Sequence, residues 1–467
     1  MDDGNRRHLF KPHRDIRSLW VVALLFSLAI FSCLASQPQS RTTASAAEFA
    51  ALAQQVVQLR GLGLKRDIAL GGLSASNGPP QTYGPFEIDQ VERAYKSIGL
   101  LPNESDLGKA LDEFRRLEQL IIYDAASGSV ILSPQAGLLG APFARTDPIF
   151  AREAPLLFGI IAALQDQHFK WQEKLNRIFL DDQRLAYRAL AVGDAALTLI
   201  ARSARKNKGD LSIGDLANAG RFGADLEKAA AHLPEFLRQQ IIFPFREGSQ
   251  FAFWAFNAQG WPGVNGLYAK PPSSTAQVIH PEKYYLNRSA PLRFFPGALL
   301  LQLKENPTVE QSLGEYVVRS LLATESSVTQ AASIATPWRG DQLFTFQDHG
   351  SLVTAWFSAW ASDTAAVEFA RAYRTVLEKR QRVRFDAMTG PTANSFAGST
   401  RDGHSVSLQA RGTVVLLLSG VQTSHLRQTT EEAWRDLEIE PDPTHIRFDL
   451  ARQRNNKAVG QLSLATR

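Results

Sequence analysis

A set of polar side chains ends an otherwise apolar stretch at residues 156–172, LLFGIIAALQDQHFKWQ. The apolar residues recur every three or four positions, which predicts one stripe of a helix, and His168 continues that stripe. Carboxylate and imidazole groups bind cations or move protons in enzymes. Gln165, Asp166 and His168 therefore indicate either the border of a catalytic site or side chains that cap loops and bond neighbouring backbone.

Three polar residues farther along the chain could complete such a site. Asp194 lies on the next predicted helix, which should pack against the first, so His168 and Asp194 form the best candidate pair. His280 and Glu282 lie in a proline-bearing loop that could line the same cleft. The structural alternatives are a packed core histidine at 168, buried amide bonds to Asp194, and an ordinary surface loop at 269–285.

The histidines and the cysteine show no spacing typical of a metal site. The single cysteine is Cys33, and no two of the nine histidines are four residues apart; the histidines stand at positions 8, 13, 168, 232, 280, 349, 404, 425 and 445. Patterns for a serine-hydrolase elbow, a phosphate-binding loop and a calcium loop are also absent. The sequence therefore predicts neither a metal nor another cofactor.

The composition is that of a folded protein. A chain of 467 residues, with 21% charged and 44% hydrophobic residues, can bury a large core and should divide into two or three domains. The net charge is +5, and no stripe of basic residues with interleaved aromatic residues is present. Nucleic acid is therefore excluded as a partner.

The N-terminal residues predict attachment to a membrane. A basic start precedes the apolar stretch 19–31, LWVVALLFSLAIF, and no charged residue occurs from 18 to 40. This pattern predicts an anchor in the cytoplasmic membrane, with the body on the extracytoplasmic (periplasmic) side. Cys33 directly follows the apolar stretch, an order that resembles a bacterial lipobox and makes it a lipidation candidate. The alternative is an uncleaved anchor in which the thiol has no role.

The remaining sequence indicates a helical region followed by a smaller mixed region. We expect an anchor at 1–36, a tether at 37–47, a helical core at 48–290, an α+β domain at 291–425 and an extension at 426–467. Helices are predicted at 48–59, 88–98, 106–120, 155–179, 182–202, 313–324 and 364–380. Strands are predicted as a hairpin at 120–123 and 129–132, and later at 342–347, 351–360, 405–410 and 412–418. Trp254 and Trp261 stand at helical spacing, which is typical of core residues, although a ligand-facing patch is the alternative.

The hairpin followed by a helix containing ALQDQHF resembles a family of exported bacterial proteins with a zinc-peptidase-like (zincin-like) core. Other stretches match that family in the same order over roughly residues 50–375. They are Gln58–Leu62, Lys65–Arg66, Tyr95–Lys96, Gly99–Pro102, Tyr123–Asp124, Ala189–Ala195, Pro271–Thr275, His280–Tyr284, Leu313–Glu315 and Gly340–Asp341. The resemblance implies an α+β fold, with a mainly helical zincin-like core, a small β-hairpin and a smaller α+β C-terminal domain.

The residues that carry the family's chemistry are replaced in this chain. The family has HExxH directly before ALQDQ, in which two histidines on one helical face bind zinc and the glutamate activates a water. These positions fall on Phe158, Gly159 and Ala162, and the third ligand, a glutamate on the next helix, falls on Val192. None of the four residues can bind a cation or move a proton. Filling the polar hole with Phe158 and Val192 would stabilise the fold by roughly 1.5–3 kcal/mol per side chain.

These observations favour a protein without catalytic activity. We expect a membrane-tethered, extracytoplasmic pseudo-metallopeptidase that serves as a binding or assembly module, with a partner protein in the envelope. One alternative is a hydrolase of altered chemistry that uses the polar residues of the former cleft. The other is a purely structural envelope lipoprotein. The sequence identifies neither the partner nor the oligomeric state.

Overall fold

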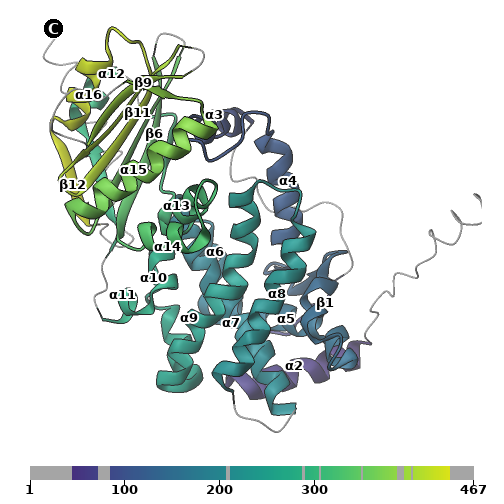
Figure 1. Ribbon diagram of the computed structural model, residues 1–467. Helices are drawn as coiled ribbons and strands as arrows, with labels where there is room; N and C mark the ends of the chain where they lie inside the picture. Colours follow the sequence, from purple (N-terminus) through teal and green to yellow (C-terminus); the bar gives the residue numbers. More distant parts are fainter. Residues whose placement is uncertain are drawn as a thin grey trace, which may run out of the picture. The chain divides into compact units, whose positions relative to one another are not determined.

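The computed structural model describes residues 45–71, 85–206, 211–286, 290–303, 307–348, 351–386, 394–400 and 403–441. The predicted anchor with Cys33, nearly all of the tether, and residues 442–467 lie outside the described residues. Every helix and strand described below belongs to one compact unit, Ala46–Arg467. The fold is α+β, as the sequence predicts (Figure 1).

The N-terminal part of this unit is mainly helical and contains one small sheet. Its helices are α2 Ala46–Arg60, α3 Pro85–Ser97, α4 Leu107–Glu118, α5 Pro148–Phe169, α6 Trp171–Leu175, α7 Asp181–Lys206, α8 Ile213–Ala229, α9 Glu235–Leu267, α10 Thr275–Ile279 and α11 Pro281–Tyr285. Two 3-10 turns lie at Ala136–Leu139 and Ala141–Phe143, and the strands are β1 Ala69–Leu70, β2 Ile121–Asp124 and β3 Ser129–Leu132.

The predicted hairpin is confirmed. Strands β2 and β3 pair antiparallel with Ile121 opposite Leu132, and β1 adds to β3 in parallel. The turn forms because Asp124 accepts hydrogen bonds from the backbone N–H of Ala126 and the hydroxyl of Ser127, while Gly128 takes a left-handed φ of 72°. This hairpin packs against α5, the helix that carries the polar stretch.

Helix α5 differs from its predicted range at both ends. It begins earlier, at Pro148, where the side chain of Asp147 accepts a hydrogen bond from Phe150 N at 3.0 Å. It ends at Phe169 because Lys170 adopts a left-handed φ of 50°, and α6 follows as a separate short helix. Among the described helices, α5 alone is long and apolar enough to cross a membrane, but 72% of its apolar window is buried within the protein, as in a core helix.

Helices α7 and α9 cross at two glycines. A Cβ added at Gly193 would lie 2.1 Å from the carbonyl carbon of Gly248, and one added at Gly248 would lie 2.2 Å from the carbonyl oxygen of Ala189. The backbones can approach this closely only because both side chains are absent. Asp194, the next residue on α7 after this crossing, is fully buried.

The C-terminal part is built on a seven-stranded sheet of order β5-β6-β7-β11-β10-β9-β8. Its strands are β5 Val309–Gln311, β6 Trp338–Asp348, β7 Ser351–Trp360, β8 Arg384–Phe385, β9 Ser395–Ser399, β10 Ser405–Arg411 and β11 Val414–Val421. Its helices are α12 Gly297–Leu303, α13 Gly314–Ala323, α14 Val328–Ala335, α15 Asp363–Arg380 and α16 Leu426–Trp434; strands β4 Leu292–Pro296 and β12 Leu437–Pro441 form a separate antiparallel pair.

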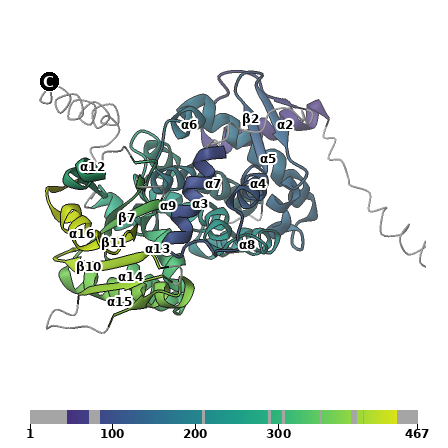
Figure 2. The ribbon, with the colours of Figure 1, turned by 90° about the horizontal axis from the view of Figure 1, so that it is seen from above.

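Helices cover both faces of this sheet, with α12 and α16 on one side and α15 on the other (Figure 2). On the α15 side, the ring of Phe369 stacks on Trp360 with their centroids 4.3 Å apart. The residues from 426 to 441 do not form a separate extension, because α16 contributes Ala433 to the core of the sheet and β12 pairs with β4. The predicted boundary at residue 425 therefore needs correction, because residues 426–441 belong to the C-terminal part of the fold.

The proline-bearing loop at 269–285 is also ordered differently from the prediction. It holds two short helices, α10 and α11, instead of irregular chain. The side chain of Ser274 accepts a hydrogen bond from the backbone of Gln277 and so starts α10. Pro281 occupies the first turn of α11, where its missing N–H costs nothing.

Candidate functional site

Phe158 on α5, which the resemblance aligns with a zinc-binding histidine, lies in an aromatic core. Its side chain is buried, and its ring centroid lies 6.1 Å from that of Phe245 on α9. Phe245 in turn stacks on Phe222 of α8 at 5.8 Å, and the contacts continue to Phe143. Phe158 therefore stands at one end of a series of ring contacts that runs from α5 through α9 to α8.

Gly159, which the resemblance aligns with a catalytic glutamate, is the point where α5 meets the hairpin. A Cβ built at Gly159 would lie 2.2 Å from Cγ1 of Val130 and 3.3 Å from Cγ2 of Ile121. Val130 is fully buried and β-branched, so it cannot swing away. The described structure thus has no room for a side chain at 159.

We expect Gly159→Ala to lower the free energy of unfolding by about 1–3 kcal/mol, because the new methyl group overpacks the contact with Val130. Chemical unfolding followed by tryptophan fluorescence measures this difference. Gly266→Ala on α9 is the matched control: an added Cβ there meets no atom within 4 Å, so the unfolding free energy should stay equal or rise. A Gly159→Ala chain as stable as the wild type would contradict the packing argument.

The two remaining replaced positions differ in burial. Ala162 on α5 is buried, whereas Val192 on α7 is partly exposed. Val192 is therefore less completely buried than we expect of a residue that fills a hole between α5 and α7. Phe158 and Ala162 supply the buried apolar surface.

Asp194 is the centre of a buried polar cluster. Its Oδ2 atom accepts hydrogen bonds from Arg60 Nη2 at 3.0 Å, from Gln165 Nε2 at 2.9 Å and from the hydroxyl of Tyr268 at 2.9 Å. The side chains of Arg60 and Asp194 are 1% and 0% exposed, so this is a fully buried ion pair. Burial and the carboxylate of Asp194 raise the pKa of Tyr268, so its hydroxyl keeps its proton and donates. We call these four residues the Asp194 cluster.

The Asp194 cluster joins α2, α5, α7 and the end of α9. Arg60 is the last residue of α2, and its second bond goes to Asn265 Oδ1 at 2.8 Å. Its guanidinium also lies over the ring of Trp261 at 4.2 Å. Three stretches quoted for the family resemblance, at 58–62, 165–168 and 189–195, therefore meet here. No local pattern in the sequence marks Arg60, Asn265 or Tyr268 as partners, because the contacts join residues that are far apart in the chain; Arg60 and Asp194 are 134 residues apart.

The other polar residues of the stretch hold neighbouring loops. His168 Nε2 lies 2.7 Å from the carbonyl oxygen of Gly63, and Gln167 Oε1 accepts a hydrogen bond from Lys65 N at 2.9 Å. Asp166 accepts from Gln172 N at 3.2 Å, and its burial raises the pKa of its carboxyl. These bonds match the capping interpretation. The pairing of His168 with Asp194 is wrong, and His168 is partly exposed rather than part of the core.

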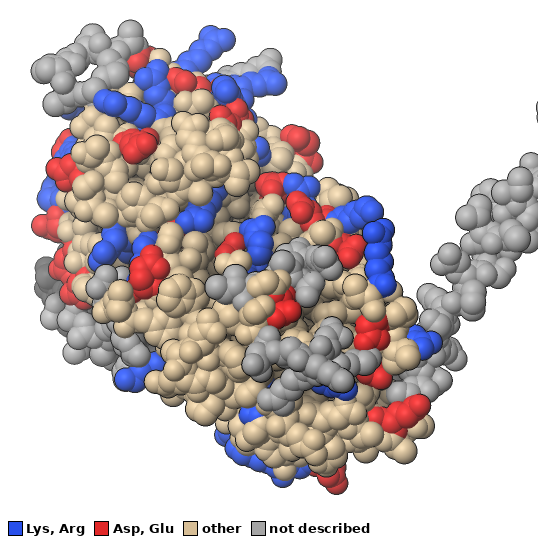
Figure 3. Space-filling model, turned by 60° about the horizontal axis from the view of Figure 1, so that its bottom comes forward, with Lys and Arg blue, Asp and Glu red and all other residues tan. Residues whose placement is uncertain are grey.

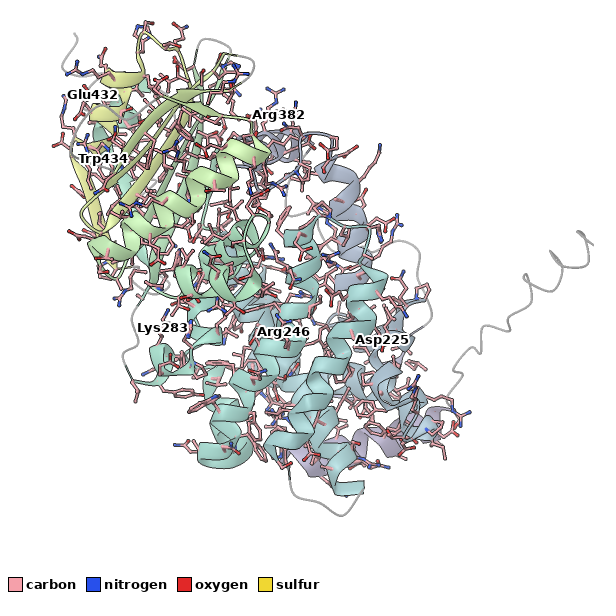
Figure 4. All side chains as sticks on the ribbon, in the orientation of Figure 1. Asp225, Arg246, Lys283, Arg382, Glu432 and Trp434 are labelled. Atoms are coloured by element: carbon pink, nitrogen blue, oxygen red, sulfur yellow. The ribbon has the colours of Figure 1, made fainter. Side chains whose placement is uncertain are left out.

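His280 and Glu282 belong to a different cluster, centred on the buried carboxylate of Glu315 at the start of α13. His280 Nε2 lies 2.8 Å from one oxygen of Glu315, and Lys283 Nζ lies 3.1 Å from the other. Figure 4 labels Lys283, which extends from α11 and also donates to the carbonyl of Thr336 at 2.8 Å. Arg319 is a third partner of Glu315, while Glu282 is 56% exposed. His168, Asp194 and His280 thus have separate partners, and the convergence that the alternative hydrolase requires is not found among them.

Two further buried acids lie beside this cluster. Asp182, at the start of α7, accepts hydrogen bonds from the backbone N–H of Thr275 at 3.0 Å and from its hydroxyl at 2.5 Å. Asp341 on β6 accepts from Leu313 N, Gly314 N and the indoles of Trp338 and Trp356 at 2.8–3.2 Å. Gly314 packs directly on Asp182, since an added Cβ would lie 1.8 Å from its Oδ1. We call Asp182, Glu315 and Asp341 the acidic cluster.

The described residues contain no group of three or more His, Cys, Asp or Glu side chains that could hold a metal ion. The cations and N–H groups around the acidic cluster already occupy the carboxylates of Glu315 and Asp341. The lipidation candidate Cys33 lies outside the described residues.

Comparison with known proteins gives one match. Residues 302–430 match a family described as a domain of unknown function (DUF8575), which covers the seven-stranded sheet from the end of α12 into α16. Neither the curated proteins nor the solved structures contain a match to the chain. Residues 302–430 are thus similar to a domain family to which no function is assigned.

Proposed function

We propose that this chain is a membrane-tethered, extracytoplasmic pseudo-metallopeptidase that acts as a binding or assembly module. The observation that carries the proposal is Gly159, whose close contact with Val130 leaves no space for the glutamate that a zinc peptidase needs. The ring contact of Phe158 with Phe245 also supports the loss of zinc binding, because the side chain aligned with a zinc-binding histidine packs in the apolar core.

The bonds of the remaining polar residues favour a binding module over a hydrolase of altered chemistry. A general base or nucleophile must face a space where substrate can lie. Asp194 is instead enclosed by Arg60, Gln165 and Tyr268, and His280 is bonded to Glu315. Each of these groups already serves to hold helices together.

Metal analysis of the full chain, purified from membranes in detergent, tests the proposal. We expect far less than one zinc per chain by mass spectrometry, and no peptide cleavage that a chelator abolishes. One zinc per chain that is lost in His168→Ala, or chelator-sensitive cleavage, would overturn the proposal.

A variant with restored ligands is the positive control for that analysis. Phe158→His, Ala162→His and Val192→Glu together restore the three ligands and leave Gly159 untouched. Two histidines four apart share one helical face, so this triple variant should bind one zinc if the family alignment is right. Adding Gly159→Glu should unfold the chain, which circular dichroism detects. A folded triple variant that binds no zinc would contradict the alignment and thus the pseudo-metallopeptidase origin.

A further inference from the structure

We propose that the aromatic end of α9, together with the exposed face of α2, lies on the membrane surface, with Trp254 in the headgroup region of the lipid. We define the aromatic end as residues 254–262 (WAFNAQGWP). The proposal rests on the membrane tether of the proposed function and adds a second contact between the body and the lipid.

These two elements carry almost no charge. Residues 248–269 contain no Asp, Glu, Lys or Arg, and the exposed face of α2 carries only Glu48, because Arg60 is buried. At the 21% average of this chain, the 37 residues of these two stretches would carry about eight charges. Figure 3, in which the end of the molecule with α2 and the end of α9 comes forward, shows broad areas without charged side chains. Such a surface loses little solvation energy on contact with lipid.

Large apolar side chains are exposed in the aromatic end of α9 and at the end of α11. Trp254 is 58% exposed, Leu286 at the end of α11 is 80% exposed and Tyr285 is 39% exposed. Phe251, one turn before Trp254 on α9, has its ring 6.1 Å from that of Tyr285, so α9 and α11 present these residues next to each other. Tryptophan and tyrosine are enriched where protein meets the lipid headgroups, because their rings are apolar and carry one polar group.

The position of α2 favours lipid as the occupant of this surface. Arg60 lies over Trp261 and bonds Asn265, so the end of α2 and the aromatic end of α9 are fixed to each other. The apolar stretch 19–31 ends 15 residues before α2 begins at Ala46. Fully extended, that length of chain reaches at most about 50 Å. A body held this close to the bilayer meets lipid continuously, whereas a partner protein must first diffuse to it.

Photo-crosslinking tests this contact. The full chain is reconstituted in vesicles of phosphatidylethanolamine and phosphatidylglycerol, with a benzophenone amino acid in place of Trp254 or of Leu286. Val328 on α14, which is 78% exposed, is the matched control position. We expect adducts with the mass of a phospholipid at 254 and 286, at least tenfold more abundant than at 328.

Three outcomes would overturn the inference. Equal lipid adducts at 254 and 328 would mean unspecific contact, and a chain-to-chain adduct at 254 would identify a second copy as the occupant. Absence of lipid adducts at 254 in chains that float with the vesicles would show that the tether holds while the surface stays in water. Chains that do not float with the vesicles would instead refute the tether, on which the proposed function depends.

Discussion

Asp194→Ala is expected to lower the free energy of unfolding by about 3–5 kcal/mol, because it leaves the guanidinium of Arg60 buried without its counter-charge. The side chain of Arg60 is 1% exposed, so water cannot replace the carboxylate. Gln165 and Tyr268 lose the acceptor of a hydrogen bond at the same time. Urea unfolding of the full chain in detergent micelles, followed by tryptophan fluorescence, measures the loss.

An exposed pair gives the matched control for this experiment. Arg177 and Glu173 are 76% and 52% exposed, so Glu173→Ala should leave the unfolding free energy unchanged within error. The double variant Asp194→Ala with Arg60→Met should recover part of the stability, because it removes the unpaired charge. If Asp194→Ala costs no more than the exposed control, Asp194 does not hold the helices together.

Local patterns explain which elements of the fold the sequence predicts. The hairpin at 121–132 is indicated by two short apolar runs on either side of a five-residue turn, 124–128, that ends in glycine, so its predicted bounds lie within two residues of the observed ones. The strand pair 338–348 and 351–360 is found for the same reason. Helix α10 was missed because its capping residue, Ser274, lies in a proline-rich stretch that is typical of irregular chain.

The candidate site contains contacts that local sequence patterns cannot predict. Asp194 and Gln165 are both candidate residues in the sequence, and Gln165 Nε2 donates a hydrogen bond to Asp194 Oδ2 at 2.9 Å in the structure. Arg60 could not be found, because a single arginine at a helix end is usually a solvated C-terminal charge. Its partner is fixed only by the crossing of α7 and α9 at Gly193 and Gly248, a tertiary feature.

Stability should fall as the pH rises from about 4 to about 7, and Asp182 accounts for a large part of this fall. Burial, opposed by the bonds from Thr275 and reinforced by the charges of Asp341 and Glu315, raises the pKa of Asp182 from 3.8 to about 7. Below pH 3.8 the carboxyl is protonated in both the folded and the unfolded chain. Between pH 3.8 and 7 only the unfolded chain releases the proton, so unfolding becomes steadily more favourable. Above pH 7 the full cost of about 4 kcal/mol remains.

Asp182→Asn should remove this dependence, because the amide keeps an oxygen for the two bonds from Thr275 and carries no charge. Between pH 4 and pH 8 the variant is therefore expected to lose about 4 kcal/mol less unfolding free energy than the wild type. Burial also raises the pKa of Asp341, so a smaller slope of the same sign should persist in the variant. Asp112→Asn on α4, with 61% of its side chain exposed, is the control and should follow the wild-type profile. Parallel profiles for the wild type and Asp182→Asn would mean that Asp182 is ionised in the folded chain, and that the contact between α7 and α10 tolerates a buried charge.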